Sequence, residues 1–329
     1  MFGEPGEARS GRSAGDVLER RAPVRVIVKI MLKGAPCGGQ RGDGRWVEFD
    51  ETSTWVVGDV TAILVVMGES SIRNLGGSSY EGHMARVYRQ GRELLPEAAA
   101  EWRRALEPLV RPESLVVDVR AGIGRFALHL ADWFKARVVA VEPAAAMRAQ
   151  AQPRERVSWM AARAEQLAVR HGVADLVWIS DAVHYLDLYC AAQEACRALK
   201  PGGRVVVRST FPDQFEQTEW MRWFPSARAV DEKRVPTVDQ IVTAFGRAGL
   251  ELESRSTLYQ PVARDLHELA DRVGERAIST LEIIDDDEFE QGLSDLRVAA
   301  AQSPSPRPIT TPLGVLVFRP ATGDSTHSP

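Results

Sequence analysis

Residues 116–126 decide the fold of this chain, and they read Val-Val-Asp-Val-Arg-Ala-Gly-Ile-Gly-Arg-Phe. The β-branched run at 115–119 is typical of a buried strand, and apolar residues at helical spacing follow over 126–134. Between them, Gly122 and Gly124 allow a tight turn in which the backbone can approach a ligand closely. The stretch therefore predicts a strand, a glycine turn and a helix whose free N–H groups can face an anion.

The same alternation of strands and helices continues around this stretch. We expect helices over 97–109, 193–199 and 240–248, two more within 267–301, and further strands over 137–141, 157–160, 176–179, 205–207, 250–258 and 313–318. Strands that are apolar on both faces indicate a mostly parallel sheet covered by helices on both sides. The expected fold class is α/β, doubly wound, with a mostly parallel sheet.

The composition is that of a globular protein. Of the 329 residues, 44% are hydrophobic and 26% are charged, which excludes a chain that is disordered throughout. A net charge of −4 argues against nucleic acid as a partner, because such a protein would carry a basic excess. The best apolar run, 55–67, is too short for a membrane span, and no signal peptide is visible. Three scattered cysteines do not indicate a disulfide scaffold, so a cytoplasmic location is expected.

The chain changes character near Met67. Residues 1–66 are dense in glycine, arginine and proline, and two interpretations stay open: a poorly ordered extension, or residues upstream of a true start at Met67. Residues 67–320 read as one domain, with helical cap or lid elements at about 79–109 and 264–301. The polar tail at 321–329 is expected to be disordered.

A carboxylate stands at the place where nucleotide sites use one. Glu142 lies eighteen residues past Gly124, at the tip of the next expected strand, where it can accept both hydroxyls of a ribose. On these residues alone a nicotinamide enzyme remains possible, because 122–127 satisfies the G-x-G-x-x-A pattern.

Four motifs in order resemble the class I S-adenosylmethionine-dependent methyltransferases, more narrowly their bacterial small-molecule branch. They are Asp118 with its glycine turn, Glu142-Pro143, the stretch 174–186 (Ala-Asp-Leu-Val-Trp-Ile-Ser-Asp-Ala-Val-His-Tyr-Leu) and the stretch 199–207 (Leu-Lys-Pro-Gly-Gly-Arg-Val-Val-Val). The resemblance spans about 80–320 and implies a seven-stranded Rossmann-like sheet. It implies S-adenosylmethionine as cofactor, S-adenosylhomocysteine as product, and disfavours the nicotinamide enzyme.

The resemblance also assigns cofactor-binding residues. Asp118 would organise the turn near the methionine end of the cofactor, and Glu142 would bind the ribose hydroxyls. Other expected cofactor residues line the turn, the acid–proline corner, the adenine loop and the end of the fourth strand: Arg120, Ala121, Gly122, Gly124, Pro143, Ala164, Glu165, Ser180 and Asp181.

One position departs from the family pattern at a critical place. Arg120 stands where the family has the first glycine of the loop. Its side chain could obstruct the methionine part of the cofactor, or its guanidinium could pair with the cofactor carboxylate. In the adenine loop, Arg163 stands where an aspartate is frequent.

The acceptor site is less determined by the sequence. His184 follows the fourth strand and is the candidate general base, although a histidine there can also be structural. Candidate substrate or cap residues, each of which could instead belong to the surface or the core, are Tyr80, Tyr88, Arg89, Arg92, Arg208, Trp220 and Trp223. The acidic run 285–288 is better interpreted as a helix N-cap than as a metal site, and no metal is expected.

The leading hypothesis is methyl transfer to the oxygen, nitrogen or carbon of a small, largely apolar metabolite or natural product. The alternative is a protein that keeps the fold without transferring methyl, such as a cyclase, a rearrangement catalyst or a silent binding partner. Arg120 favours the alternative, because it alters the loop that positions the sulfonium group. Small molecules are the expected partners, with no nucleic acid and no membrane, and the chain would be a monomer or a homodimer.

Overall fold

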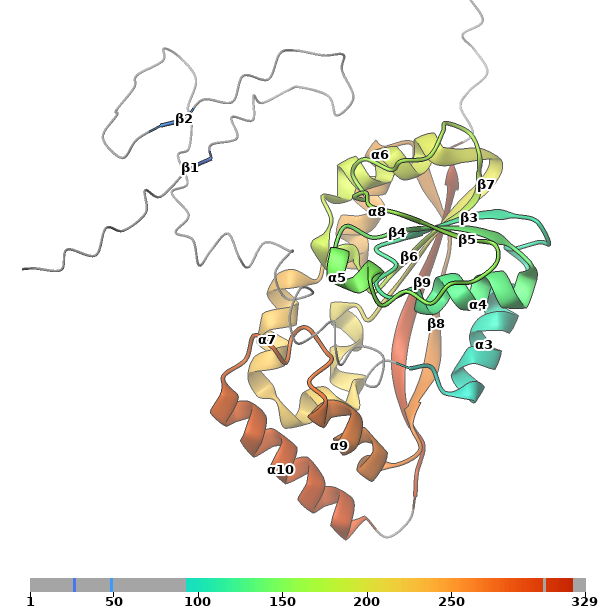
Figure 1. Ribbon diagram of the computed structural model, residues 1–329. Helices are drawn as coiled ribbons and strands as arrows, with labels where there is room; N and C mark the ends of the chain where they lie inside the picture. Colours follow the sequence, from blue (N-terminus) through green and yellow to red (C-terminus); the bar gives the residue numbers. More distant parts are fainter. Residues whose placement is uncertain (1–25, 28–47, 50–92, 304–305, 322–329) are drawn as a thin grey trace, which may run out of the picture. The chain divides into compact units, whose positions relative to one another are not determined.

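The structure is a computed structural model that describes residues 93–303 and 306–321 together with two short strands (Figure 1). The chain divides into two units, Met1–Val66 and Met67–Pro329. In the first unit β1 (Val26–Ile27) pairs antiparallel with β2 (Glu48–Phe49). The expectations for 79–92 and for 322–329 fall outside the described residues, and the rest of the description concerns the second unit.

Seven strands form one sheet in the order β5-β4-β3-β6-β7-β9-β8. They are β3 (Leu115–Val119), β4 (Arg137–Val141), β5 (Val157–Met160), β6 (Ala174–Ser180), β7 (Leu199–Ser209), β8 (Leu250–Ala263) and β9 (Ile309–Pro320). Neighbours from β5 to β7 are parallel, whereas β9 runs antiparallel to both β7 and β8. The predicted α/β fold with a mostly parallel, seven-stranded sheet is confirmed.

Helices cover both faces of this sheet (Figure 1). The helices are α3 (Pro96–Leu106), α4 (Arg125–Phe134), α5 (Ala145–Arg148), α6 (Leu188–Ala198), α7 (Pro225–Arg234), α8 (Val238–Arg247), α9 (Leu266–Gly274) and α10 (Asp286–Gln302). Alanines of α6 and the apolar side of α8 pack on one face. Trp102 of α3 and Phe126 of α4 pack on the other. Because both faces are covered, β3 is apolar on both sides, as the sequence indicated.

A third cluster forms away from the sheet. The chain between β8 and β9 contributes α9 and α10, which pack against the 3₁₀-helix η4 (Glu219–Trp223) and α7. Phe224 stacks on Phe289 with ring centroids 5.8 Å apart. The two helices predicted for this insertion are confirmed, and Asp285 caps α10 by accepting the N–H of Asp287 at 2.9 Å.

The chain after β6 shows three features that its sequence did not indicate. The segment 212–234 holds the 3₁₀-helix η3 (Pro212–Gln217), η4 and α7. The mostly polar α7 buries only Ala227 and Asp231, so it shows no apolar period to detect. Lys200-Pro201-Gly202-Gly203 lies near the start of β7, which follows α6 directly. Arg208 is not an exposed strand end, because it lies within β7 and is 2% exposed.

Candidate active site

The turn between β3 and α4 has the backbone that its sequence predicts. Gly122 and Gly124 have φ of +62° and +88°, values that glycine adopts without steric cost. Gly124 is the N-cap of α4, and a Cβ there would lie 2.6 Å from the Trp159 ring. Arg120 also has a positive φ, +59°, so the residue that replaces the family's glycine keeps a glycine-like backbone.

Glu142 is fixed against this turn. The carboxylate is buried, and its two oxygens accept the backbone N–H groups of Gly122 and Ala144, each at 2.9 Å. Arg148 donates to the carbonyl oxygens of Glu142 and Pro143, which holds the chain that follows β4. Each carboxylate oxygen keeps acceptor capacity for a further donor, as binding of a ribose requires.

Asp118 lies beneath the turn rather than at its surface. Burial raises the pKa of its carboxyl group to about 8; the charge of Glu142 adds to this effect, and the Ala127 N–H and Arg125 oppose it. Oδ2 of Asp118 makes no hydrogen bond within the described residues. The position suits a group that shapes the turn from below.

A small cavity of about 20 Å³ opens at this corner. Its lining includes five of the predicted cofactor residues, namely Arg120, Gly122, Glu142, Ser180 and Asp181, and three that the sequence argument did not select, Met147, Ala182 and Tyr185. The Arg120 guanidinium lies 4.9 Å from the centroid of the Tyr185 ring. Pockets that hold nucleotide-sized ligands typically enclose about 300 Å³ or more, so Arg120 and Tyr185 nearly close this corner.

The remaining predicted cofactor residues do not line this cavity. Ala164 packs in the core, and Glu165 accepts the N–H of Asp187 at 3.0 Å. Ala121, Gly124 and Pro143 contribute backbone beside the turn.

A larger cavity of about 170 Å³ lies beside the first. The candidate base His184 lines it, as do the predicted substrate residues Arg208 and Trp220, whereas Trp223 packs with the third cluster. Its apolar walls come from η3, η4, α9 and their neighbours: Phe215, Met221, Val235, Leu269, Val273 and Ile278. Tyr80, Tyr88, Arg89 and Arg92 lie outside the described residues.

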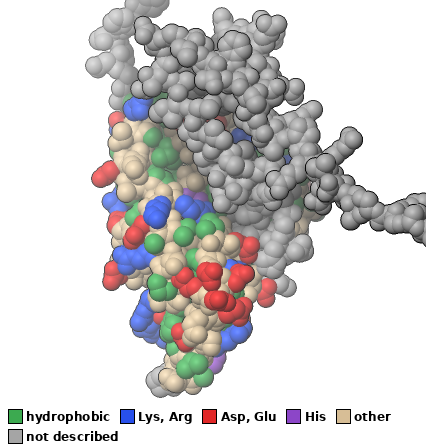
Figure 2. Space-filling model, turned by 90° about the vertical axis from the view of Figure 1, so that its left-hand side faces the viewer, with side chains coloured by type: hydrophobic (Ala, Val, Ile, Leu, Met, Phe, Trp, Pro, Cys, Tyr) green, Lys and Arg blue, Asp and Glu red, His purple; other side chains and the backbone are tan. Residues whose placement is uncertain are grey.

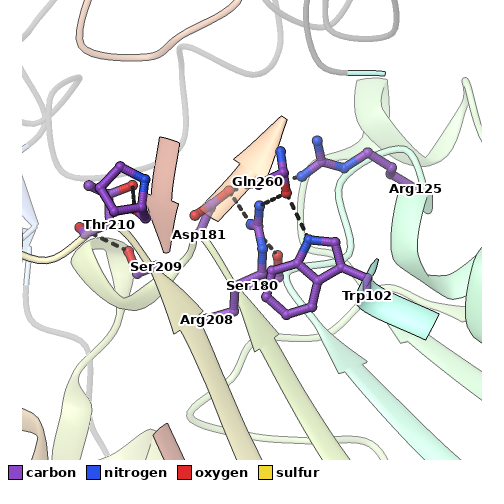
Figure 3. Close-up of polar contacts among 9 residues, drawn as sticks. Trp102, Arg125, Ser180, Asp181, Arg208, Ser209, Thr210 and Gln260 are labelled. Carbon is purple, nitrogen blue, oxygen red and sulfur yellow. Dashed lines mark hydrogen bonds and ion pairs between the residues drawn. The ribbon is translucent and has the colours of Figure 1, made fainter. Parts of the chain in front are cut away.

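A buried polar network forms one end of the larger cavity (Figure 3). Arg208 donates through Nη1 to Asp181 at 2.5 Å and to Ser180 at 3.0 Å, and through Nη2 to Gln260 at 2.8 Å. Its guanidinium lies 5.0 Å from the ring centroid of Trp102, which also donates to Gln260 at 2.8 Å. Sequence reasoning missed Trp102 and Gln260, which stand far from every motif. The buried guanidinium of Arg208 is therefore paired with the Asp181 carboxylate and lies against the Gln260 amide and the Trp102 ring.

Asp181 borders both cavities. It follows β6 directly, with a φ of +50°, and its N–H donates to the carbonyl oxygen of Arg208 at 2.8 Å. Arg125, at the start of α4, lies 3.9 Å from the same carboxylate. Side chains from β6, β7 and α4 therefore meet where the two cavities adjoin, at the carboxyl ends of parallel strands.

Among the described residues, no group of three or more His, Cys, Asp or Glu side chains could hold a metal ion. No helix in the described part of the chain is long and apolar enough to cross a membrane.

This geometry agrees with a known class. Residues 117–207 match the family described as a methyltransferase domain. The match includes the glycine turn, Glu142 after β4 and the chain from there to Val207 in β7. Residues 117–207 are therefore similar to methyltransferase domains, whose class I members use S-adenosylmethionine.

Individual relatives agree at low identity. A Dictyostelium discoideum protein described as a methyltransferase is 28% identical over 95 residues, which is 29% of this chain and 36% of that protein. The chain thus matches about a third of that relative's length. A solved structure from Anabaena variabilis, described as a methyltransferase of an antibiotic biosynthesis pathway, superposes with a TM-score of 0.56 at 21% identity, covering 66% of this chain and 96% of that one.

A second solved structure extends over more of the chain. A Haemonchus contortus phosphoethanolamine N-methyltransferase, in complex with phosphomonomethylethanolamine and S-adenosylhomocysteine, has a TM-score of 0.51 at 15% identity. The likeness covers 84% of this chain and 62% of that one. At such identities both structures establish the fold and nothing finer.

Proposed function

We propose that this chain transfers a methyl group from S-adenosylmethionine to a small, largely apolar metabolite or natural product. The observation that carries the proposal is the position of Asp181, which borders both the corner cavity and the larger, partly apolar cavity. A donor bound at the turn and an acceptor in the larger cavity would meet at this carboxylate. Holding two reactants in line can supply roughly 7–11 kcal/mol of the barrier.

The residues at the corner suit the cofactor chemically. Glu142 would accept the ribose hydroxyls, and the turn with the start of α4 would present N–H groups. When bound, S-adenosylmethionine supplies an electrophilic methyl group on a sulfonium sulfur. Asp181 and Ser180 would lie beside that methyl group and would position the acceptor. His184, on the 3₁₀-helix η2 (Val183–Tyr185), would take the proton of an oxygen or nitrogen acceptor.

Arg120 must move for this cofactor to enter. Its guanidinium contacts the Tyr185 ring and makes no ion pair with any described carboxylate. A cation–π contact at such a site contributes about 0.5–1 kcal/mol, whereas an ionised hydrogen-bonded pair contributes roughly 1.5–3 kcal/mol. The carboxylate of the cofactor would therefore draw Arg120 off the ring and into a bidentate pair.

The surface of the described part also suits a small-molecule partner. Figure 2 shows basic and acidic side chains side by side over this face, and the largest group of one sign there is acidic. Binding to nucleic acid would be favoured by a basic stripe instead.

Calorimetry with S-adenosylmethionine, S-adenosylhomocysteine and NAD tests the proposal. We expect the first two to bind and NAD not to bind. Arg120→Gly should weaken binding of S-adenosylhomocysteine about tenfold or more, because it removes a carboxylate partner. Arg170→Gly, at an exposed loop position, is the control and should bind like the wild type. A gain in affinity for Arg120→Gly would show that the arginine obstructs the site.

A second candidate function rests on the small size of the corner cavity. With Arg120 on Tyr185, only about 20 Å³ remains there, which excludes a cofactor, and a substrate in the larger cavity would be ordered for cyclisation or rearrangement without methyl transfer. Mass spectrometry across a panel of apolar acceptors separates the two. A product heavier by one methylene unit supports the methyltransferase, and an isomerised product of unchanged mass supports the alternative.

A further inference from the structure

The polar end of the larger cavity presents hydrogen-bond donors that the fold leaves unused. Trp102 Nε1 and Arg208 Nη2 both donate to Oε1 of Gln260, each at 2.8 Å. Two donors on one atom require that atom to be the amide oxygen, so the amide nitrogen lies on the other side. Figure 3 shows this nitrogen pointing away from Trp102 and Arg208.

Gln260 and Arg208 both line the cavity, at 7% and 2% exposure. The amide nitrogen of Gln260 donates to nothing within the described residues. The Nε of Arg208 is buried and likewise has no hydrogen-bond partner there. Buried donors without partners are costly, and a ligand that accepts from them removes that cost.

Guanidinium groups gather at this end. Those of Arg125 and Arg208 both lie within ion-pair distance of the Asp181 carboxylate. The other charged groups on the cavity wall lie elsewhere along it. Asp231 has Arg234 at 3.7 Å, Arg272 has Glu268 at 3.1 Å, and Glu93 is exposed.

We propose that Gln260 and Arg208 bind a carboxylate of the methyl acceptor, whose apolar body would lie against Phe215, Met221 and Leu269. The acceptor is then a small apolar acid. Calling the ligand the methyl acceptor rests on the proposed function, whereas the carboxylate-binding site itself does not. Recognition by a buried amide and a guanidinium gives direction as well as affinity, since both present fixed N–H groups to the two carboxylate oxygens.

Three probes with the same ring test the proposal on the full chain. They are phenylacetate, phenylacetamide and 2-phenylethanol, followed by NMR at millimolar concentration through the indole N–H signal of Trp102, assigned with Trp102→Phe. We expect phenylacetate to bind at least about tenfold more tightly than either neutral probe. Equal binding of the acid and the amide, or no measurable preference for the acid, overturns the proposal.

Gln260→Glu sharpens the test, because Trp102 and Arg208 can still donate to one carboxylate oxygen while the other faces the cavity. The preference for phenylacetate should then disappear. Gln217→Glu adds the same charge at an exposed position and should keep the preference. If Gln260→Glu retains the full preference, Gln260 does not bind the acid and the proposal fails. If that variant does not fold, the three-probe comparison on the wild type still decides.

Binding of S-adenosylhomocysteine separates this proposal from the proposed function. Gln260 does not line the corner cavity, so Gln260→Glu should bind S-adenosylhomocysteine like the wild type. A wild type that binds phenylacetate but not S-adenosylhomocysteine would contradict the methyltransferase and keep the acid site. The reverse result would keep the methyltransferase and overturn the acid site.

Discussion

Asp118 is an ionisable group held in the interior beneath the glycine turn. Its carboxyl group is 2% exposed, and burial together with the charge of Glu142 raises its pKa from 3.8 to about 8. Between these two values the folded chain keeps a proton that the unfolded chain releases. The contribution of Asp118 to the free energy of unfolding is therefore largest below about pH 4 and is lost as the pH rises towards 8.

We predict that Asp118→Asn flattens this dependence. The wild type should lose about 1.4 kcal/mol of stability per pH unit relative to the variant between the two pKa values, because one proton distinguishes them. Urea unfolding of both proteins across this range measures the difference. Asp132→Asn, an exposed aspartate of α4, is the control and should follow the wild type. Parallel curves for wild type and Asp118→Asn would contradict the prediction.

The residues of the site differ in how far the sequence could predict them. Glu142 and Gly122 were predictable, because a strand–turn–helix unit fixes where its own ends lie, and both line the corner cavity. Gln260 was not predictable, since it stands near the end of a long strand, outside every motif, and meets Trp102 across 158 positions of the chain. A long-range side-chain contact leaves no local pattern. Whether His184 acts as a base stays a prediction.

At the scale of elements, the insertion between β8 and β9 is joined to η4 by close packing. Gly292 of α10 lies so near that a Cβ there would be 2.3 Å from the Trp223 carbonyl oxygen and 2.7 Å from the Phe224 ring. The glycine lets α10 approach the segment that carries Trp220 and Met221, which line the larger cavity.

Gly292→Ala should destabilise the protein by about 1–3 kcal/mol, because the added methyl group overpacks this contact. In a helix interior, replacing glycine by alanine would by itself stabilise the protein by roughly 1 kcal/mol. A loss of stability would therefore come from the close packing. Gly274→Ala is the control: the nearest atom to its Cβ would be 3.6 Å away, an ordinary contact. Urea unfolding measures both, and equal effects of the two substitutions would refute the close approach.

Elements were predictable where their burial is periodic. The strands β3, β4 and β5 match their expected bounds, because each is a short apolar run between loop residues. The helix α7 was missed, since only two of its residues are buried and no apolar period marks it in the sequence.

At the scale of the whole molecule, the core that the structure describes belongs to the second unit. The buried side chains of the sheet and its helices begin at Leu94 and end at Phe318. The nature of residues 1–66 stays a prediction, and a shortened chain can test it.

We predict that a chain beginning at Met67 keeps a single cooperative melting transition and the wild-type affinity for S-adenosylhomocysteine. The reason is that the sheet, both of its covering layers and the corner cavity come from the second unit. Differential scanning calorimetry and titration calorimetry measure the two properties, with the full chain as control. Loss of the transition would show that residues 1–66 are part of the fold.

The pairing of β8 with β9 over their whole length has a consequence for how this protein can diversify. Twelve residue pairs join these two strands, from Leu250 to Ala263 on one side. The intervening segment begins and ends on this hairpin, whereas the glycine turn follows β3, which lies three strands from β9 and four from β8 in the sheet. Exchange of residues 264–308 in evolution or by recombination would replace part of the wall of the larger cavity and leave Gly122 and Glu142 unchanged. Under the proposed function, such an exchange would change the acceptor and keep the cofactor.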